Sequence, residues 1–425
     1  MGGADRKTLA GILEPRLPAD FLRDTYGRDF LHVRGRRGRF SHLLPWPVLN
    51  EILARHRLNA PRLRLMCDGA RVPVSAYTRH AAPQGQRAAV PRLRAERLNE
   101  QLRAGATLVL DAVDELHAPL EELAEGLELT FRERVQINMY AGWRTSHGFD
   151  LHWDDHDVFI LQVAGRKRWR IYGQTRPHPL SRQDPEPTPK PTGDALWEDT
   201  LEDGDLLYIP RGWWHVAFPL DEPTLHLTVG IHARTGVDLL RWLADGLRAS
   251  ELYRRDLPRL SSPQEQAAHA AALREELLAC FDDAALARYL ADCDANAEPR
   301  PRAGLPLAAT PEVSSPPPET FVRLTAPRPL AFDVSDGSIE FACNRKLWKF
   351  DGRAHAVLQQ LAERRVCRVS ELCEGARGVL DSETVRAFVG ELIRHGLLAV
   401  VEAGAAGAGA AGGGGAGTAE SRGAR

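Results

Sequence analysis

Three side chains with the chemistry of metal ligands stand in two short motifs of this sequence. His152 and Asp154 are two positions apart in HWDDHDVF, and His215 ends the later segment PRGWWH. If the first motif is extended, His152 and Asp154 point to one face of a strand, because side chains alternate with a period of two. Two imidazoles and a carboxylate leave open positions on a non-haem iron(II). The pattern therefore predicts an iron site with His215 as the third ligand.

Other polar residues in the first motif are poorer ligand candidates. Asp155 and Asp157 would point away from His152 in an extended chain. His156 would share its face, but four residues at roughly 3.3 Å each place the two Cα atoms about 13 Å apart. A lone His-x-Asp pair is more often a solvated polar segment than a metal site. The apolar strand that follows it and the distant His215 favour the metal site here.

A lysine is the second residue in the second of two predicted strands, 158–163 and 166–172. Lys167 shares parity with Trp169 and Ile171, so it faces inward if these two side chains do. Only 5 of the 55 basic residues are lysines, so composition alone does not account for a lysine here. A buried cation is costly unless an anion pairs with it. We therefore expect Lys167 to hold a buried anion, and the alternative is a side chain that extends to solvent.

The order of these motifs resembles that of a known family. NMY (138–140), HWDDHDVFILQVAGRKRWRIY (152–172), GDLLYIPRGWWH (204–215) and LHLTVGI (225–231) resemble the JmjC-type 2-oxoglutarate oxygenases, and most of all the ribosomal oxygenases, which hydroxylate ribosomal proteins. The resemblance covers roughly residues 20 to 400. It implies a mainly β catalytic core of the double-stranded β-helix (cupin, jelly-roll) type, a helical extension and a C-terminal winged-helix-like α+β domain.

The resemblance also implies roles for individual residues. His152, Asp154 and His215 bind Fe(II), and Lys167 pairs with the distal carboxylate of 2-oxoglutarate, the cosubstrate that is consumed with O2. The remaining expected site residues are Asn138 and Thr228 for cosubstrate binding, and Tyr140, Trp143 and Trp214 for substrate binding.

The implied activity is hydroxylation of an arginine or histidine side chain of a ribosomal protein. Bacterial relatives that act on an arginine can carry Arg at the cosubstrate position, where this chain has Lys167. One alternative is the same chemistry on a peptide natural product, RNA or a small metabolite. Another is a metal-binding cupin of a different reaction class, which would not bind 2-oxoglutarate. A third is a winged-helix DNA-binding regulator with a non-catalytic cupin sensor.

Composition favours an intracellular protein of two or three domains. The 425 residues carry 55 basic and 57 acidic side chains, so no overall basic field indicates nucleic-acid binding. The 6 cysteines are scattered without a CxxC pair, which is typical of reduced thiols. The N-terminus has no apolar signal core, and no segment reaches membrane-spanning length. We expect a soluble, cytoplasmic protein.

Changes in pattern along the chain predict its domains. The oxygenase domain has a bracing region of helices and strands followed by a barrel core of short strands, and the proline-rich segment 174–194 is expected to be a loop or lid at the barrel mouth. In order, the expected parts are an N-terminal segment 1–19, the oxygenase domain 20–235 (bracing region 20–128, barrel core 129–235), a helical dimerisation region 236–297, a proline-rich linker 298–327, a winged-helix-like domain 328–402 and a disordered Gly/Ala tail 403–425.

The helical region 236–297 and the winged-helix-like domain 328–402 indicate which binding partners to expect. Apolar positions in 237–247 form a helical stripe, and Ser262 with Pro263 begins a second helix. By its position, this region resembles the dimerisation region of the ribosomal oxygenases, which implies a homodimer. In the winged-helix-like domain, the presumed recognition helix 382–394 mixes acidic with basic residues. A helix that enters a DNA groove should be clearly basic, so protein contact is favoured over DNA binding.

Overall fold

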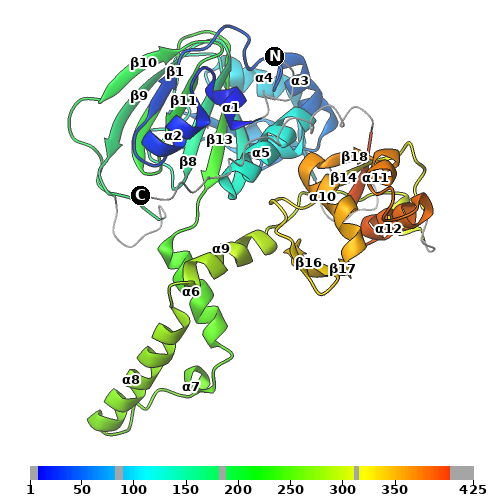
Figure 1. Ribbon diagram of the computed structural model, residues 1–425. Coiled ribbons are helices and arrows are strands. Elements are labelled where there is room, and N and C mark those ends of the chain that lie inside the picture. Colours follow the sequence, from blue (N-terminus) through cyan, green and yellow to red (C-terminus); the bar gives the residue numbers. More distant parts are fainter. Residues whose placement is uncertain (1–7, 82–89, 181–187, 311–314, 403–425) are drawn as a thin grey trace, which may run out of the picture. The chain divides into compact units, whose positions relative to one another are not determined.

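The computed structural model describes residues 8–81, 90–180, 188–310 and 315–402 (Figure 1). The chain divides into two compact units, Met1–Ala233 and Arg234–Arg425. The tail predicted at 403–425 lies outside the described residues, as do residues 181–187 of the predicted lid. The described parts of 175–194 contain no helix or strand, in keeping with their prolines.

The first unit contains two facing antiparallel sheets, which confirms the predicted cupin-type core (Figure 1). The larger sheet has the order β1-β11-β8-β13-β7-β6-β2-β3, and the smaller has the order β10-β9-β12. The larger sheet is built from β1 (Leu31–Val33), β2 (Leu63–Cys67), β3 (Ala70–Arg71), β6 (Thr107–Leu110), β7 (Arg134–Gly142), β8 (Asp157–Ala164), β11 (Leu206–Ile209) and β13 (Thr224–His232). The smaller sheet is built from β9 (Lys167–Gln174), β10 (Trp197–Leu201) and β12 (Trp213–Pro219), and β4 (Thr78–Ala81) pairs separately with β5 (Val90–Leu93).

Strand β8 is apolar along nearly its whole length because both of its faces are covered. Val158 and Ile160 pack toward the small sheet, in a cluster with Trp169. Phe159 and Leu161 point to the opposite face and join the larger core. Burying each such side chain contributes about 1.5–3 kcal/mol. Continuous apolar sequence is typical of a strand between two layers.

Helices cover the outer face of the large sheet. Leu120, Leu123 and Leu127 of α5 lie on one side of that helix and share the core with Phe159 and Leu161. The helices of this unit are α1 (Leu9–Leu13), α2 (Pro18–Asp24), α3 (Trp46–Arg55), α4 (Ala95–Arg103) and α5 (Ala118–Phe131), with short 3₁₀ turns η2 (Val74–Ala76) and η3 (Val113–Glu115). No helix among the described residues of the chain is long and apolar enough to cross a membrane.

The second unit begins with helices. Ser262 and Glu265 form a capping box at the start of α8, and Leu239, Leu243 and Tyr289 form a small core between α6 and α9. The helices are α6 (Gly236–Leu247), α7 (Glu251–Arg254), α8 (Pro263–Cys280) and α9 (Ala285–Ala295).

The C-terminal part of this unit has its own core of helices and two three-stranded sheets. One sheet has the order β18-β14-β19 and the other β15-β16-β17. The elements are η4 (Leu307–Ala309), β14 (Phe321–Leu324), β15 (Asp333–Ser335), β16 (Ser338–Cys343), β17 (Lys346–Asp351), η5 (Gly352–Ala354), α10 (His355–Arg364), β18 (Val366–Arg368), α11 (Val369–Gly375), α12 (Ser382–Arg394) and β19 (Leu398–Val401). Its assignment as a winged helix stays a prediction.

Strand β14 lies inside the segment 298–327 that the sequence predicted to be a linker, so that interpretation was wrong at this point. The strand occupies the centre of its sheet, between β18 and β19. Val322 and Leu324 alternate into the core of this part of the unit. The many prolines upstream led to the prediction of a linker, and a strand of four residues whose partners are distant in sequence gives too short a pattern to be recognised.

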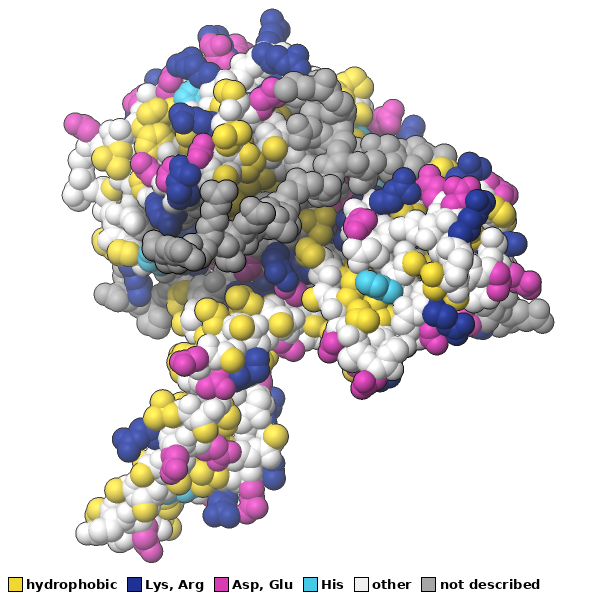
Figure 2. All heavy atoms as spheres, in the orientation of Figure 1, with side chains coloured by type: hydrophobic (Ala, Val, Ile, Leu, Met, Phe, Trp, Pro, Cys, Tyr) yellow, Lys and Arg dark blue, Asp and Glu magenta, His cyan; other side chains and the backbone are white. Residues whose placement is uncertain are grey.

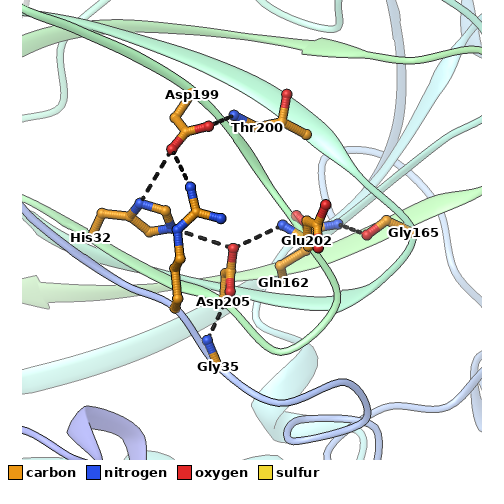
Figure 3. A network of polar contacts seen from close by, with 9 residues as sticks. His32, Gly35, Gln162, Gly165, Asp199, Thr200, Glu202 and Asp205 are labelled. Carbon is orange, nitrogen blue, oxygen red and sulfur yellow. Dashed lines mark hydrogen bonds and ion pairs between the residues drawn. The ribbon is translucent and has the colours of Figure 1, made fainter.

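A polar network joins the edge strand β1 to both sheets of the first unit (Figure 3). The buried Asp205 carboxylate accepts hydrogen bonds from the backbone N–H of Gly35 at 2.8 Å and of Glu202 at 3.0 Å. Its second oxygen also lies 3.3 Å from His32 Nε2, while His32 Nδ1 lies 3.9 Å from Asp199 of the small sheet. Burial alone would raise the pKa of Asp205, but the hydrogen bonds from His32 and the two backbone groups lower it below its usual value.

Replacing Asp205 with Asn should reduce the free energy of unfolding by about 1–3 kcal/mol, because a carboxamide oxygen cannot accept all of these hydrogen bonds. Since the folded-state pKa of Asp205 is depressed, its contribution is present above the unfolded-state pKa of about 3.9 and is lost as the pH falls below it. Urea unfolding at pH 7 and pH 3 measures both effects. The exposed Asp194→Asn variant is the control, and equal stability of both variants at pH 7 would contradict the expectation.

Candidate metal centre

Three potential ligands converge at one point in the first unit. One ligand atom from each of His152, Asp154 and His215 lies within 4.8 Å of the others, the only such group of His, Cys, Asp or Glu residues in the part of the chain that the structure describes. His215 Nε2 lies 3.5 Å from Asp154 Oδ2, and His152 Nε2 lies 4.0 Å from Asp154 Oδ1. Two nitrogens and one carboxylate form the donor set of a facial site for non-haem iron(II).

The backbone brings the two histidines together. His152 and His215 exchange backbone hydrogen bonds of 3.1 and 2.7 Å, an isolated antiparallel bridge. The continuous strand expected through His152 and Asp154 does not form: Asp154 lies in the loop before β8. Asp154 is held instead by its carbonyl, which accepts from Gly212 N–H at 2.9 Å. Gly212 adopts φ +82°, and a Cβ there would come within 2.5 Å of Pro179.

Both imidazoles are oriented by backbone carbonyls. His152 Nδ1 lies 2.7 Å from the carbonyl oxygen of Asp150, and His215 Nδ1 lies 2.9 Å from that of Trp213. A carbonyl can only accept, so each Nδ1 carries the hydrogen and each Nε2 keeps its lone pair. Those Nε2 atoms are the ones that face Asp154. The site is therefore prepared for a metal ion on the side of Asp154.

The three ligands open into a cavity of ≈ 310 Å³ between the two sheets. Its walls include Asn138 and Tyr140 of β7 and Thr228 of β13. Asn138 and Thr228 are directly opposite each other on paired strands, so their side chains share the cavity face. The structure thus brings the candidate ligands together with both additional cosubstrate candidates, Asn138 and Thr228, and one substrate candidate, Tyr140.

Lys167 reaches the same cavity from β9. The alternation of that strand buries Lys167 with Trp169 and Ile171, as its sequence predicts. No carboxylate of the described residues lies within ion-pair distance of the ammonium, and its Nζ lies 5.8 Å from the centre of the Trp169 ring. Burial lowers the pKa of Lys167 to about 7. The expected buried anion is therefore not a residue of the described protein, and the cavity is where one can enter.

His226 lies beside Lys167 and was missed in the sequence. Its ring stacks on that of Tyr140 at 5.0 Å with an interplanar angle of 4°. Burial lowers the pKa of His226 well below its usual value, and the charge of Lys167 adds to this. Its Nδ1 is buried without a hydrogen-bond partner. The available signal was parity, since His226 is two residues before Thr228 on one predicted strand.

Two predicted substrate residues do not line the cavity. Trp143 packs on Trp46 with ring centres 5.7 Å apart, on the helix-covered face of the large sheet. Trp214 is buried, and its Nε1 donates to Thr175 Oγ1 at 2.8 Å. Strand alternation explains the second case, because neighbours in β12 point to opposite faces and His215 takes the inner one.

His156 also lines the cavity but stands outside the group of three ligands. Its Nδ1 lies 3.0 Å from Asp155 Oδ1, and its ring lies 4.3 Å from that of His232. Burial lowers the pKa of His232 to about 4, with a further contribution from His156.

A second residue that sequence reasoning missed is Arg64 of β2, which reaches the cavity from the N-terminal region. No sequence signal connects that strand to the site.

Comparison with known proteins agrees with this geometry. Residues 117–239 match the JmjC domain family. The bifunctional lysine-specific demethylase and histidyl-hydroxylase NO66 of Drosophila persimilis is 30% identical over 241 residues, which are 53% of this chain and 32% of that protein. The protein of the same name from Dictyostelium discoideum is 30% identical over 236 residues, 53% of this chain and 42% of its own length. The chain thus spans less than half the length of these relatives.

Solved structures show the same fold. The crystal structure of Escherichia coli ribosomal oxygenase YcfD aligns with a TM-score of 0.56 at 17% identity, over 91% of this chain and 98% of that chain. The structure of YcfD in complex with cobalt and 2-oxoglutarate aligns with a TM-score of 0.51 at 18% identity, over 90% and 97% of the two chains. The motifs, the matched domain and the fold agree. Residues 117–239 of this chain form a JmjC domain, and the chain has the fold of YcfD.

Proposed function

We propose that this protein is an Fe(II)- and 2-oxoglutarate-dependent hydroxylase of an arginine or histidine side chain in a ribosomal protein. The observation that carries the proposal is the shared cavity of the His152–Asp154–His215 group and the buried Lys167. A metal with open positions and an unpaired cation are the two features that a chelating dicarboxylate requires. The donor set fits iron(II), and the buried ammonium fits the far carboxylate.

Each group of residues in the cavity would have a distinct role. His152, Asp154 and His215 hold the iron through two Nε2 atoms and a carboxylate oxygen. Lys167 binds the distal carboxylate of 2-oxoglutarate, and Asn138 with Thr228 lines the space between. When bound, iron and 2-oxoglutarate supply the oxidation of a C–H bond by O2, with release of succinate and carbon dioxide. Ile160 and Trp169 give the cavity an apolar wall that limits water.

The comparisons support the target class. NO66 carries histidyl-hydroxylase in its name, and YcfD is described as a ribosomal oxygenase. Both are JmjC-type relatives by sequence or by fold, so a protein side chain is the favoured substrate. With such a substrate, a cytoplasmic location follows as part of the proposal.

Homodimer formation through α6–α9 is part of the same proposal. Apolar side chains gather on the surface of these helices (Figure 2). Helix α8 has no buried residue within the chain. Exposed apolar surface of this extent is typical of an interaction site. The exposed side chains are Val237, Leu240, Leu257, Leu260, Leu278, Phe281, Leu286 and Leu290.

The described surface of α12 gives little support to the DNA-binding alternative. Glu383 and Glu391 oppose Arg386 and Arg394 on this helix. Arg386 donates to the backbone carbonyl of Pro316 at 2.9 Å, so its guanidinium is already engaged. A helix for the phosphate-lined groove needs free positive charge.

Removal of one candidate ligand should greatly weaken metal binding. We expect the wild-type protein to bind one Co(II) with a visible absorption band, and Asp154→Ala to bind it more than about 100-fold more weakly. His156→Ala is the matched control, because it lines the same cavity outside the ligand group. Titration of metal-free protein measures both affinities. Equal weakening in the two variants would contradict the assignment.

Lys167→Ala should raise the KM for 2-oxoglutarate by about tenfold to a hundredfold, the value of a charged hydrogen bond. A bound carboxylate raises the pKa of Lys167 from its free value of about 7. Affinity should therefore be full below pH 7 and fall by up to about tenfold per pH unit above it. Succinate release measured from pH 6 to 9 tests this. Arg168→Ala, on the exposed face of the same strand, is the control, and a pH-independent KM would refute the role of the amine.

Mass spectrometry of intact ribosomal proteins tests the substrate. Cells of the source organism with and without this gene should differ by one oxygen atom on a single ribosomal protein. The wild-type gene should restore the modification, whereas Asp154→Ala should not. Unchanged masses throughout would remove the ribosomal assignment and leave the oxygenase chemistry to be tested on other substrates by succinate release.

A further inference from the structure

Arg64 supplies a second cationic side chain to the wall of the cavity. It extends from β2, and its guanidinium donates to Asp111 Oδ1 at 2.7 Å. Its Nε is buried and has no hydrogen-bond partner. A buried N–H without an acceptor costs about 1–3 kcal/mol. The position of Arg64 in the cavity wall and the missing acceptor indicate that a bound ligand accepts the hydrogen bond of its Nε–H.

Strand pairing fixes where Arg64 lies relative to the rest of the cavity. Arg64 is opposite Val109, Val109 is opposite Tyr140, and Tyr140 is opposite His226. Directly paired residues share a face of the sheet, so the four side chains form one row. At 4.7–4.9 Å per strand, the row is about 14 Å long. His226 is at the end beside Lys167, and Arg64 is at the other end, beyond Tyr140.

The hydrogen-bond acceptors in the wall around Arg64 are already engaged. The Asn138 side-chain oxygen already accepts from Ala112 N–H and from Gln136 Nε2, each at 2.9 Å. The Asn138 amide nitrogen is the donor that remains, and the Asn138 side chain is hydrogen-bonded to the Tyr140 hydroxyl. Of the carboxylates near the cavity, Asp111 is paired with Arg64, Asp155 with His156, and Asp154 with the two candidate ligand histidines. A side chain that enters here meets the Arg64 Nε–H, which has no acceptor, and the positive charge of the guanidinium.

We propose that Arg64 selects the target side chain, and that it favours a neutral imidazole, which can accept a hydrogen bond, over a cationic guanidinium. This inference rests on the proposed hydroxylase function and makes histidine the target. A guanidinium only donates, so it would leave the Arg64 Nε without an acceptor and place two cations together. A neutral imidazole presents one unprotonated nitrogen, which satisfies that donor.

Peptide pools with one fixed central residue and randomised flanks provide the test. Separate pools carry histidine or arginine at the centre, and each is incubated with the protein, Fe(II), 2-oxoglutarate and O2. Mass spectrometry then measures the one-oxygen gain of each pool. We expect the histidine pool to be hydroxylated and the arginine pool to be hydroxylated at least about tenfold less, the equivalent of one lost hydrogen bond.

Variants of Arg64 separate selection from general damage. Arg64→Gln should lower hydroxylation of the histidine pool by about tenfold to a hundredfold and reduce the difference between the pools. Its Co(II) affinity and its 2-oxoglutarate turnover without peptide should match those of the wild type. Arg71→Gln, the same change on the exposed strand β3 outside the cavity, should alter none of these values.

Two results would overturn the proposal. One is preferential hydroxylation of the arginine pool by the wild type. The other is an Arg64→Gln variant that keeps the wild-type selectivity while it folds and binds Co(II) normally. If Arg64→Gln fails to fold, Arg64→Lys keeps the charge and removes the Nε donor, so it should lose the part of the selectivity that the Nε–H contributes and keep the part due to charge. Absent 2-oxoglutarate turnover in the wild type would instead refute the hydroxylase function itself.

Discussion

The reciprocal pair of backbone hydrogen bonds between His152 and His215 is the constraint on which the site depends. It joins the loop before β8 to strand β12 of the small sheet, and it brings the two imidazole centres to 4.4 Å. Both Nδ1 atoms are committed to backbone carbonyls, so the Nε2 atoms are directed at Asp154 without help from an ion. The two sheets must therefore be folded onto each other before the donor set exists. Such a prepared site loses little entropy when its ligand arrives.

Alternation along single strands was the part of the structure that the sequence could predict. It identified the inward face of β9, and with it the burial of Lys167. It failed where the chain leaves regular structure: the ligands His152 and Asp154 were placed on one strand face, but they come from a bridge and a loop. Arg64, whose position depends on neighbouring strands, carries no local signal, and the only signal for His226 is its parity with Thr228. Strand β14 was missed for the same reason, since its partners β18 and β19 are far along the chain.

The electrostatics of the cavity depend on the lack of a neutralising carboxylate near Lys167 among the described residues. Neighbouring His226 is held neutral by burial and by the lysine charge, and no carboxylate of the described residues neutralises the ammonium. The folded protein therefore carries an internal cost that a bound anion removes. Metal and lysine together place positive charge at two points of one cavity, which favours a ligand with negative charge at both ends over a monoanion.

The row from His226 to Arg64 crosses strands that belong to very different stretches of the sequence. The candidate metal ligands and Lys167 lie between residues 152 and 215, whereas Arg64 belongs to a strand nearly ninety positions earlier than His152. The candidate metal site and the residue proposed to select the target thus come from separate segments of the sequence. If Arg64 selects the target side chain as proposed, a substitution in β2 would change that selection and leave the candidate metal ligands and Lys167 in place.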